Sequence, residues 1–248
     1  MPESTTRVDI VIPVYSEERD LERSITRLRE FLQQDCPYRW RIVVADNASQ
    51  DRTLAIAQEL ARRWPGEVGY IHLDKKGRGR ALRRAWLDSD ADVVSYMDVD
   101  LSTGLDAFMP MLEPLARGEL HVATGSRLLP QSRIKRSLLR EFISRMYNLI
   151  VKLMFPRKRF SDAQCGFKAC TSKAVQELVP LVQDQAWFFD SELLLRAEQC
   201  GYRIHDVPVQ WEEDPGTTVK IASTAWEDIK GLFRVRFTPN PKPIHTES

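Results

Sequence analysis

The sequence Val93-Val94-Ser95-Tyr96-Met97-Asp98-Val99-Asp100 joins an apolar, strand-like run to two carboxylates that one residue separates. Residues i and i+2 of an extended chain point to the same side, so Asp98 and Asp100 are predicted to hold one divalent cation. Ligands of open α/β sheets bind at the carboxyl ends of the strands. The stretch therefore indicates an enzyme that handles a phosphate-bearing substrate through a metal ion. The alternative is an acidic, solvated turn.

Strand and helix patterns alternate on the N-terminal side of this stretch. Short β-branched runs are followed by apolar residues at helical spacing, and Ser16 is expected to cap the first helix. The predicted strands are 8–14, 41–45, 68–73 and 93–97, and the predicted helices are 16–31, 51–63 and 79–87. This order predicts the α/β class, with a doubly wound, mostly parallel sheet flanked by helices.

The alternation becomes irregular after Asp100. Helices are expected at 105–117, 137–155, 175–182, 191–200 and 224–237, and strands at 121–125 and 202–211. No linker divides the chain, so we expect one domain over 1–237 and a flexible, proline-rich tail over 238–248.

The composition is that of a folded, soluble protein, with 43% hydrophobic and 29% charged residues. A formal net charge of +1 gives no bulk attraction to nucleic acid. Cys36, Cys165, Cys170 and Cys200 form no Cys-x-x-Cys pair and no zinc spacing, which predicts reduced thiols in the cytoplasm. The sequence contains neither a signal-peptide core nor an apolar run long enough to span a bilayer. If a membrane is involved, we expect this chain to lie on its cytoplasmic face.

Polar loops follow the predicted strands. They bring carboxylates, glycines and cations to four adjacent strand ends: Pro13, Tyr15 and Glu17 after the first, Asp46, Asn47 and Asp51 after the second, the basic run 74–80 after the third, and Asp98 and Asp100 after the fourth. Such a set suits a nucleoside diphosphate with its metal. Taken singly, each loop is also compatible with packing or with a solvated surface.

Several of these loops match known motifs. The run 11–18 (Val-Ile-Pro-Val-Tyr-Ser-Glu-Glu) resembles the opening motif of family 2 glycosyltransferases, which have the GT-A fold. Further matches are 46–53 with the second motif of that family, 76–82 with its Lys-Gly-x-Gly loop, and 98–102 with its Asp-Ala-Asp-Leu-Ser motif.

Later motifs narrow the resemblance. They resemble the polyprenyl-phosphate sugar synthases, especially the dolichyl-phosphate glucose synthase-like branch: Gly125-Ser126-Arg127, Asp162-Ala163-Gln164-Cys165-Gly166-Phe167-Lys168, Phe189-Asp190-Ser191-Glu192-Leu193-Leu194 and Val207-Pro208-Val209-Gln210-Trp211. The resemblance runs from about Val8 to about Gly231. Two departures are Asn47, where aspartate is common, and the loop 214–220, where the family usually has Gly-Ser-Lys or Gly-Ser-Arg.

The resemblance implies roles for individual residues. Asp98 and Asp100, with Val99 between them, would bind Mg²⁺ or Mn²⁺ on the donor diphosphate. The other donor-binding residues would be Pro13, Tyr15, Glu17, Asp46, Lys76 and Arg78. The acceptor side would be formed by Arg127, Arg145, Gln164 and Glu192. Asp190 lies near that pocket and is either a catalytic base or only the N-cap of the helix that follows it.

The predicted helix 137–155 addresses the acceptor. Its apolar residues fall on one face, and the stretch from Arg133 to Arg159 holds nine Lys or Arg and a single acid, Glu141. Such an amphipathic helix suits an interface with anionic lipid. The alternative is packing on the core or on a second subunit, so a homo-oligomer stays open.

The sequence therefore predicts a metal-dependent, inverting glycosyltransferase. It would move a hexose or N-acetylhexosamine from a nucleotide sugar, with UDP preferred, to polyprenyl phosphate at the membrane, as in cell wall glycan biosynthesis. Two alternatives are kept. One is a soluble family 2 enzyme with a hydroxyl acceptor, and the other is a non-catalytic nucleotide-sugar-binding subunit that serves a membrane protein partner.

Overall fold

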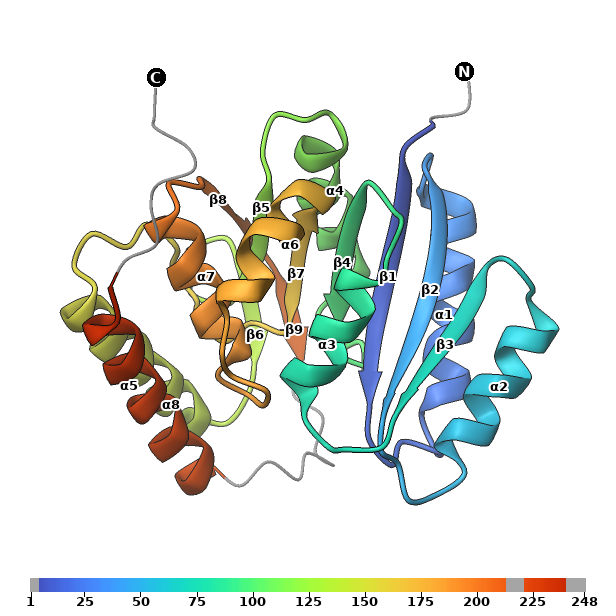
Figure 1. The fold of residues 1–248 in the computed structure, drawn as a ribbon, viewed down its shortest axis with the longest axis horizontal. Helices are drawn as coiled ribbons and strands as arrows, with labels where there is room; N and C mark the ends of the chain where they lie inside the picture. Colours follow the sequence, from blue (N-terminus) through green and yellow to red (C-terminus); the bar gives the residue numbers. More distant parts are fainter. Residues whose placement is uncertain (1–4, 213–220, 240–248) are drawn as a thin grey trace.

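One mixed sheet runs through the molecule in the strand order β3-β2-β1-β4-β7-β5-β8 (Figure 1). The computed structural model describes residues 5–212 and 221–239. Within the sheet only β7 runs antiparallel to its neighbours. Its strands are β1 (Arg7–Val14), β2 (Arg39–Asn47), β3 (Val68–Leu73), β4 (Val93–Met97), β5 (Val122–Ser126), β7 (Phe167–Thr171) and β8 (Ile204–Pro208). The predicted α/β class and mostly parallel sheet are confirmed.

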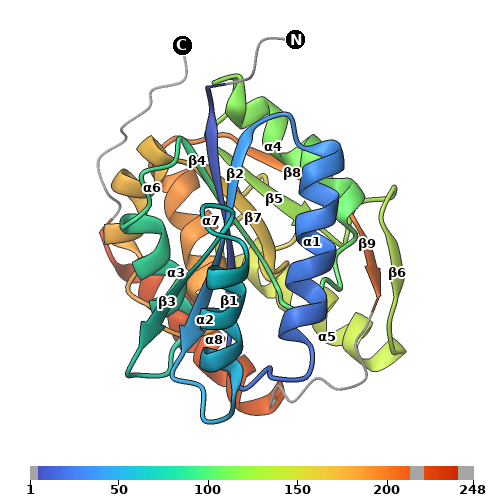
Figure 2. The same ribbon diagram turned by 90° about the vertical axis from the view of Figure 1, so that its right-hand side faces the viewer.

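Helices cover both faces of the sheet, as Figure 2 shows from the side. One face packs on α1, α2 and α4 and the other on α3, α6 and α7, with α5 and α8 outside α7. The helices are α1 (Leu21–Asp35), α2 (Thr53–Arg63), α3 (Arg78–Leu87), α4 (Phe108–Ala116), α5 (Leu138–Met154), α6 (Ser172–Leu178), α7 (Phe189–Gln199) and α8 (Ile221–Phe237), with short 3-10 turns η1 (Leu105–Ala107) and η2 (Val179–Leu181).

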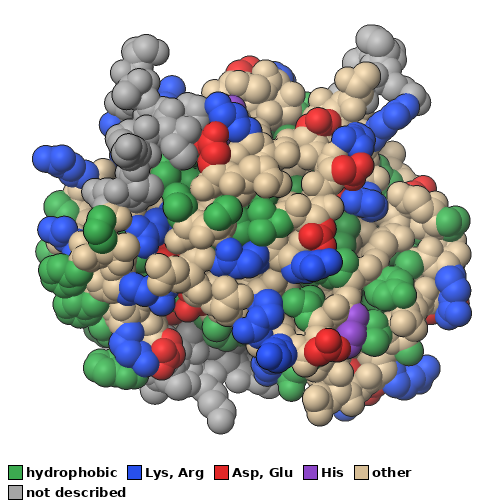
Figure 3. Space-filling model, in the orientation of Figure 1, with side chains coloured by type: hydrophobic (Ala, Val, Ile, Leu, Met, Phe, Trp, Pro, Cys, Tyr) green, Lys and Arg blue, Asp and Glu red, His purple; other side chains and the backbone are tan. Residues whose placement is uncertain are grey.

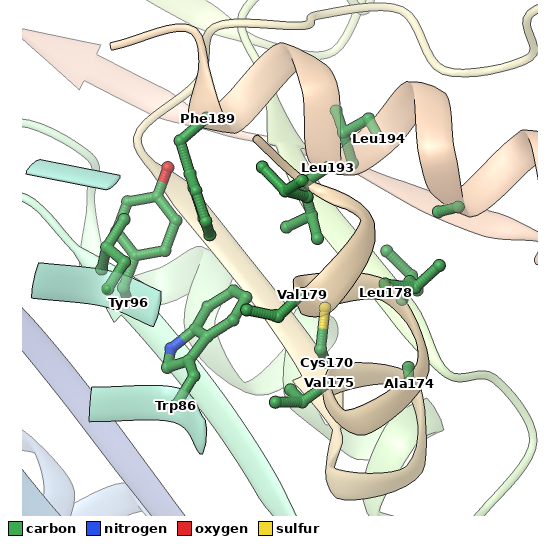
Figure 4. Packing of buried hydrophobic residues seen from close by; sticks show 14 of the residues in the cluster. Trp86, Tyr96, Cys170, Ala174, Val175, Leu178, Val179, Phe189, Leu193 and Leu194 are labelled. Carbon is green, nitrogen blue, oxygen red and sulfur yellow. The ribbon is translucent and has the colours of Figure 1, made fainter. Parts of the chain in front are cut away.

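The core on the α3 side reaches the site directly. Trp86 of α3 packs against Tyr96 of β4 and Phe189 of α7, with ring centroids 5.9 and 6.2 Å apart (Figure 4). Aromatic rings in such tilted and edge-on contacts resist displacement because interiors are close-packed. The Tyr96 hydroxyl therefore has a fixed position under the strand ends.

Two local predictions were wrong, and one strand of the main sheet was not predicted. The predicted strand 202–211 divides at Val209 into β8 and β9 (Gln210–Glu212), and β9 pairs with β6 (Arg133–Lys135) in a separate two-stranded sheet. Ser16 does not cap α1, because it lies in a loop with a left-handed φ of 57° and the helix begins at Leu21. Strand β7 was not predicted.

Some predicted features lie outside the described residues. The loop 214–220, where the sequence departs from the family, falls wholly in the undescribed segment 213–220. Most of the predicted tail 238–248, which follows the end of α8 at Phe237, falls in a second undescribed segment, 240–248. Within the described residues no helix combines the length and hydropathy that a bilayer-spanning helix needs.

Candidate active site

The carboxyl ends of β1, β2 and β4 lie side by side because β1 pairs in parallel with both neighbours. This is where the chain order of the sheet reverses, the place where open α/β sheets bind ligands. Side chains tie the first two loops together: the Ser16 N–H donates to Ser49 Oγ at 2.9 Å, and the Glu17 N–H donates to Thr53 Oγ1 at 2.8 Å. The loop that carries Tyr15 and Glu17 is therefore held in place before any ligand binds.

Asp46 and Asn47 end strand β2 and fix the loops around them. Asp46 is fully buried and its Oδ2 lies 2.6 Å from Nδ1 of His72. Asn47 Oδ1 accepts a hydrogen bond from the Gly77 N–H at 2.6 Å. Asn47, the departure from the family motif, thus fixes the glycine loop.

Lys76 and Tyr15 come together across the mouth of this region. Lys76 Nζ lies 3.3 Å from the centroid of the Tyr15 ring, a cation–π contact that draws the basic loop toward β1. Pro13 lies in β1 opposite Ala45 of β2. The predicted donor residues therefore surround one end of β1 and β2.

The acidic pair follows β4 in a tight turn. The Leu101 N–H donates to the Asp98 carbonyl at 3.1 Å, and Leu101 has a left-handed φ of 49°. We predicted that Asp98 and Asp100 share one orientation because they lie in an extended chain. That prediction is wrong, because the chain turns here. Val99 is buried in the core, so its side chain has no surface to offer a donor.

The two carboxylates fit a divalent ion. The Asp98 side chain is 41% exposed, and Asp100 Oδ1 accepts from the Ser102 N–H at 2.9 Å, which orients that carboxylate. The described residues contain no group of three or more His, Cys, Asp or Glu that could enclose a metal. Mg²⁺ in phosphate-handling sites is typically held by one or two carboxylates, with substrate phosphates and water as the other ligands. A pair of carboxylates agrees with that ligand set.

Gly166 makes room for Asp98. A Cβ at Gly166 would lie 2.1 Å from Asp98 Oδ2, closer than any real contact. We expect Gly166→Ala to displace this carboxylate and to weaken the binding of a divalent metal about 10- to 100-fold. The measurement is a titration of the protein with Mn²⁺. Gly69→Ala is the matched control, because nothing lies within 4 Å of its Cβ. Unchanged metal affinity in Gly166→Ala would contradict a metal role for Asp98.

Arg78 joins the acidic pair to α7. Its Nη1 lies 2.6 Å from Asp190 Oδ2, and its Nη2 donates to Asp98 Oδ1. Asp190 also accepts from the Tyr96 hydroxyl, and its Oδ1 lies 3.2 Å from Nζ of Lys168, which is fully buried. A buried carboxylate with three charged or polar partners is a fixed anchor for Arg78.

The same partners set the protonation of Asp190. Burial alone would raise the pKa of Asp190, but the charges of Lys168 and Arg78 hold that pKa below its ordinary value. Asp190 lies inside α7, whose N-cap is Phe188, so the N-cap interpretation is wrong. The carboxylate is ionised at neutral pH and already fully engaged.

Arg127 pairs with a second buried carboxylate. Its Nε and Nη2 lie 2.7 and 3.0 Å from the two oxygens of Asp162, and its Cζ lies 5.8 Å from the Trp211 ring of β9. Burial would raise the pKa of Asp162, but Arg127 holds it well below its ordinary value. Gln164 lies two residues farther and donates through Nε2 to Asp228 of α8 at 2.8 Å.

Two predicted acceptor residues lie apart from this group. Glu192 is fully buried, and Arg234 of α8 holds it at 2.5 Å, so it offers no surface to a ligand in this arrangement. Arg145 is exposed on α5 and pairs with Glu141 at 2.5 Å. Within the described residues Arg145 forms no hydrogen bond or ion pair with another predicted site residue.

Sequence reasoning missed Lys168, Asp162 and Asp228. The first two stand inside the quoted motif 162–168, where a lysine between Phe167 and Ala169 was a usable indication of a buried charge. Asp228 gave no comparable indication, because only the fold brings α8 to Gln164. Burial raises the pKa of Asp228 to about 7.

Comparison with known proteins identifies the family. The model of "Glycosyl transferase family 2" matches residues 9–178. The chain belongs to glycosyl transferase family 2. The match covers the loops after β1, β2, β3 and β4 and the motif around Gln164, so the predicted family is confirmed.

Curated relatives of this family 2 chain carry related names. Glycosyltransferase AglD of Haloferax volcanii is 36% identical over 226 residues, covering 91% of this chain and 35% of AglD. Dolichyl-phosphate beta-glucosyltransferase of Saccharomyces cerevisiae is 26% identical over 247 residues, covering 92% of this chain and 74% of the yeast protein. The chain thus spans about a third of AglD, and the resemblance to the dolichyl-phosphate glucose synthase-like branch is confirmed.

Solved structures show the same fold. Glucosyl-3-phosphoglycerate synthase from Mycobacterium tuberculosis, in complex with UDP, aligns with a TM-score of 0.70 at 17% identity, covering 94% of this chain and 81% of the other. Its complex with Mn²⁺, UDP and phosphoglyceric acid aligns with a TM-score of 0.68 at 16% identity. The GT-A fold predicted for this family 2 member is confirmed.

Proposed function

We propose that this protein is an inverting glycosyltransferase that moves a hexose or N-acetylhexosamine from a nucleoside diphosphate, with UDP preferred, to polyprenyl phosphate at a membrane surface. The observation that carries the proposal is the Arg78 guanidinium held between Asp98 and Asp190 at the carboxyl end of β4. It sets a cation beside a carboxylate that can bind a metal, where a leaving diphosphate needs both. The dolichyl-phosphate glucosyltransferases among the relatives support the acceptor class.

On the donor side, the loops after β1 and β2 would hold the base and ribose, with Tyr15 and Glu17 as the lining groups. Asp46 is fully buried against His72 and would act by positioning that loop. Asp98 and Asp100 would hold Mg²⁺ or Mn²⁺, which supplies Lewis-acid neutralisation of the diphosphate when bound. Lys76 and Arg78 add positive charge from the protein. Charge that is positioned in advance stabilises a leaving group without reorganisation during the reaction.

Chemistry at the sugar then needs little proton transfer. A phosphate oxygen of the acceptor attacks the anomeric carbon, the bond from that carbon to the diphosphate oxygen breaks, and the electron pair leaves with the nucleoside diphosphate. A phosphate is already anionic at neutral pH, so no general base is required. Asp190, with a lowered pKa and three partners, suits an anchor for Arg78 better than a base.

Arg127 is our candidate for the acceptor phosphate. Arg127 donates hydrogen bonds to Asp162 through Nε and Nη2. Among the described residues its Nη1 has no hydrogen-bond partner. A guanidinium fixed on one edge can present its remaining N–H groups to an anion at low entropic cost. Gln164 lies near Asp162 and would complete this side. The role of Arg145 stays a prediction.

The outer helices support a membrane-facing surface. Leu138, Phe142 and Leu153 on α5 are 88%, 63% and 72% exposed, and Phe237 on α8 is 76% exposed. Figure 3 shows hydrophobic side chains gathered with Lys and Arg along the edge of the molecule that α5 and α8 form. Large exposed apolar patches mark interaction sites, and interspersed cations suit anionic lipid. We propose peripheral association on the cytoplasmic face of the membrane.

The test is sugar transfer to a short polyprenyl phosphate in vesicles. Radiolabelled UDP-glucose, UDP-N-acetylhexosamines and GDP-mannose are compared, each with and without Mg²⁺ or Mn²⁺. We expect metal-dependent label in the organic phase, highest with a UDP-sugar. Metal-dependent release of nucleoside diphosphate without lipid label would favour a soluble hydroxyl acceptor. Tight donor binding with neither product would favour a non-catalytic subunit.

A further inference from the structure

A cavity of about 690 Å³ lies away from the strand ends, where α5, α7 and α8 all terminate. Phe155 follows the end of α5, Glu198 and Gln199 end α7, and Arg236 lies in the last turn of α8. The catalytic loops after β1, β2 and β4 contribute nothing to its lining. This cavity is therefore separate from the candidate active site.

Positive charge dominates the lining. The lining includes Arg157, Lys158, Arg159 and Arg236, and Glu198 is the one acidic residue among the lining groups. Glu198 accepts from the Arg159 N–H, and burial raises the pKa of Glu198. Within the described part of the chain, neither Arg157 nor Arg236 has an ion-pair partner.

The helix ends reduce this excess without cancelling it. A helix C-terminus carries about half a negative charge, so three of them contribute about one and a half. Against Arg157, Lys158 and Arg236, the helix ends and Glu198 leave an excess of about half a positive charge; Arg159 has a further partner and is not counted. Arg157 and Arg236, which have no ion-pair partner in the described part of the chain, suit a ligand with one negative charge, such as a phosphodiester.

Two exposed apolar side chains are direct sequence neighbours of lining residues. Leu153 precedes the lining residue Met154 on α5, and Phe237 follows the lining residue Arg236 on α8. Both are among the most exposed apolar side chains of the protein. A free anion would make no favourable contact with these apolar side chains. A lipid offers both a charged head group and apolar chains that can contact them.

We propose that this cavity binds the phosphate of an anionic phospholipid at the membrane, and so fixes how α5 and α8 lie on the bilayer. The inference rests on the proposed membrane association but not on sugar transfer. It adds a head-group site to a surface otherwise defined only by exposed apolar residues.

Vesicle co-sedimentation tests the proposal. The full chain is mixed with phosphatidylcholine vesicles with and without phosphatidylglycerol. Two charge-assisted contacts to one phosphate predict that Arg157→Gln/Arg236→Gln weakens binding to the anionic vesicles at least about a hundredfold. The matched control, Lys152→Gln/Lys230→Gln, removes the same charge from exposed positions of α5 and α8 outside the cavity. Because this control loses only two surface charges, we expect its binding to the anionic vesicles to weaken by at most about thirtyfold.

The outcomes separate the hypotheses. Equal losses in the two double variants would overturn the site and leave a diffuse electrostatic effect. Release of the wild type from vesicles by inorganic phosphate, but not by a chloride salt at the same ionic strength, would show a simple anion site and overturn the lipid assignment. Transfer to a short acceptor in detergent should be unchanged in Arg157→Gln/Arg236→Gln. If wild type shows no transfer but binds vesicles through the cavity, only the proposed reaction fails.

Discussion

Replacement of Asp100 by asparagine should lower sugar transfer about a thousandfold at saturating donor. Asparagine keeps the size of the side chain and the hydrogen bond from the Ser102 N–H, but it removes the negative charge that a divalent ion needs. The measurement is labelled lipid product, with the metal concentration varied. Asp98→Asn should have a comparable effect.

Asp100→Asn is the cleaner of the two variants. Asp98 also pairs with Arg78, so its replacement changes the position of Arg78 as well as the metal ligand. Asp88→Asn is the control, because Asp88 is partly exposed at the end of α3 and pairs with Arg84. Metal-dependent transfer by Asp100→Asn at the wild-type rate would mean that the ligands lie elsewhere.

The geometry of the proposed donor half was predictable because its determinants are local. Each β-branched run is followed directly by its polar loop, and parallel pairing of β1 with β2 and β4 brings those loops together. The sequence pattern alone predicts that Tyr15, Asp46 and Asp98 lie at one edge of the sheet, without any information on packing. Even there, the orientation of the acidic pair depended on the turn at Leu101, which the period-2 argument did not include.

The geometry of the proposed acceptor half depends on contacts between distant segments. Strand β7 was missed because its Lys168 interrupts an apolar run, which normally argues against a buried strand. That lysine is buried because Asp190, twenty-two positions later in the chain, lies beside it. The contact of Gln164 with Asp228 is also set by the docking of α8. No local pattern encodes such a pair.

Asp190→Asn should destabilise the protein by about 3 kcal/mol, because removal of one partner leaves the charge of Lys168 buried and uncompensated. Asparagine has only one side-chain oxygen, so it cannot accept hydrogen bonds on both sides. Its NH₂ group would face either Arg78 or Tyr96 and Lys168, and all three of these residues are donors. Chemical denaturation at neutral pH measures the loss. Asp90→Asn, at an exposed surface pair with Arg7, is the control and should leave stability unchanged.

The pH dependence identifies the charge as the cause. The pKa of Asp190 is lower in the folded protein than in the unfolded chain, so its contribution is present above a pH of about 4 and is lost as the pH falls through the folded value. The stabilities of wild type and Asp190→Asn should therefore converge in acid. A second replacement, Lys168→Met, should restore part of the lost stability, since it removes the unpaired charge.

Kinetics then distinguish an anchor from a base. If Asp190 only positions Arg78, the variant loses donor affinity and rate, but its pH–rate profile keeps the shape of the wild type. A general base would instead have its pKa near the operating pH, and its removal would abolish the rising limb of that profile. Loss of that limb, with stability intact, would contradict the anchor role and favour a hydroxyl acceptor, which needs a base where a phosphate does not. The same variant therefore tests both the network around Lys168 and the chemical class of the acceptor.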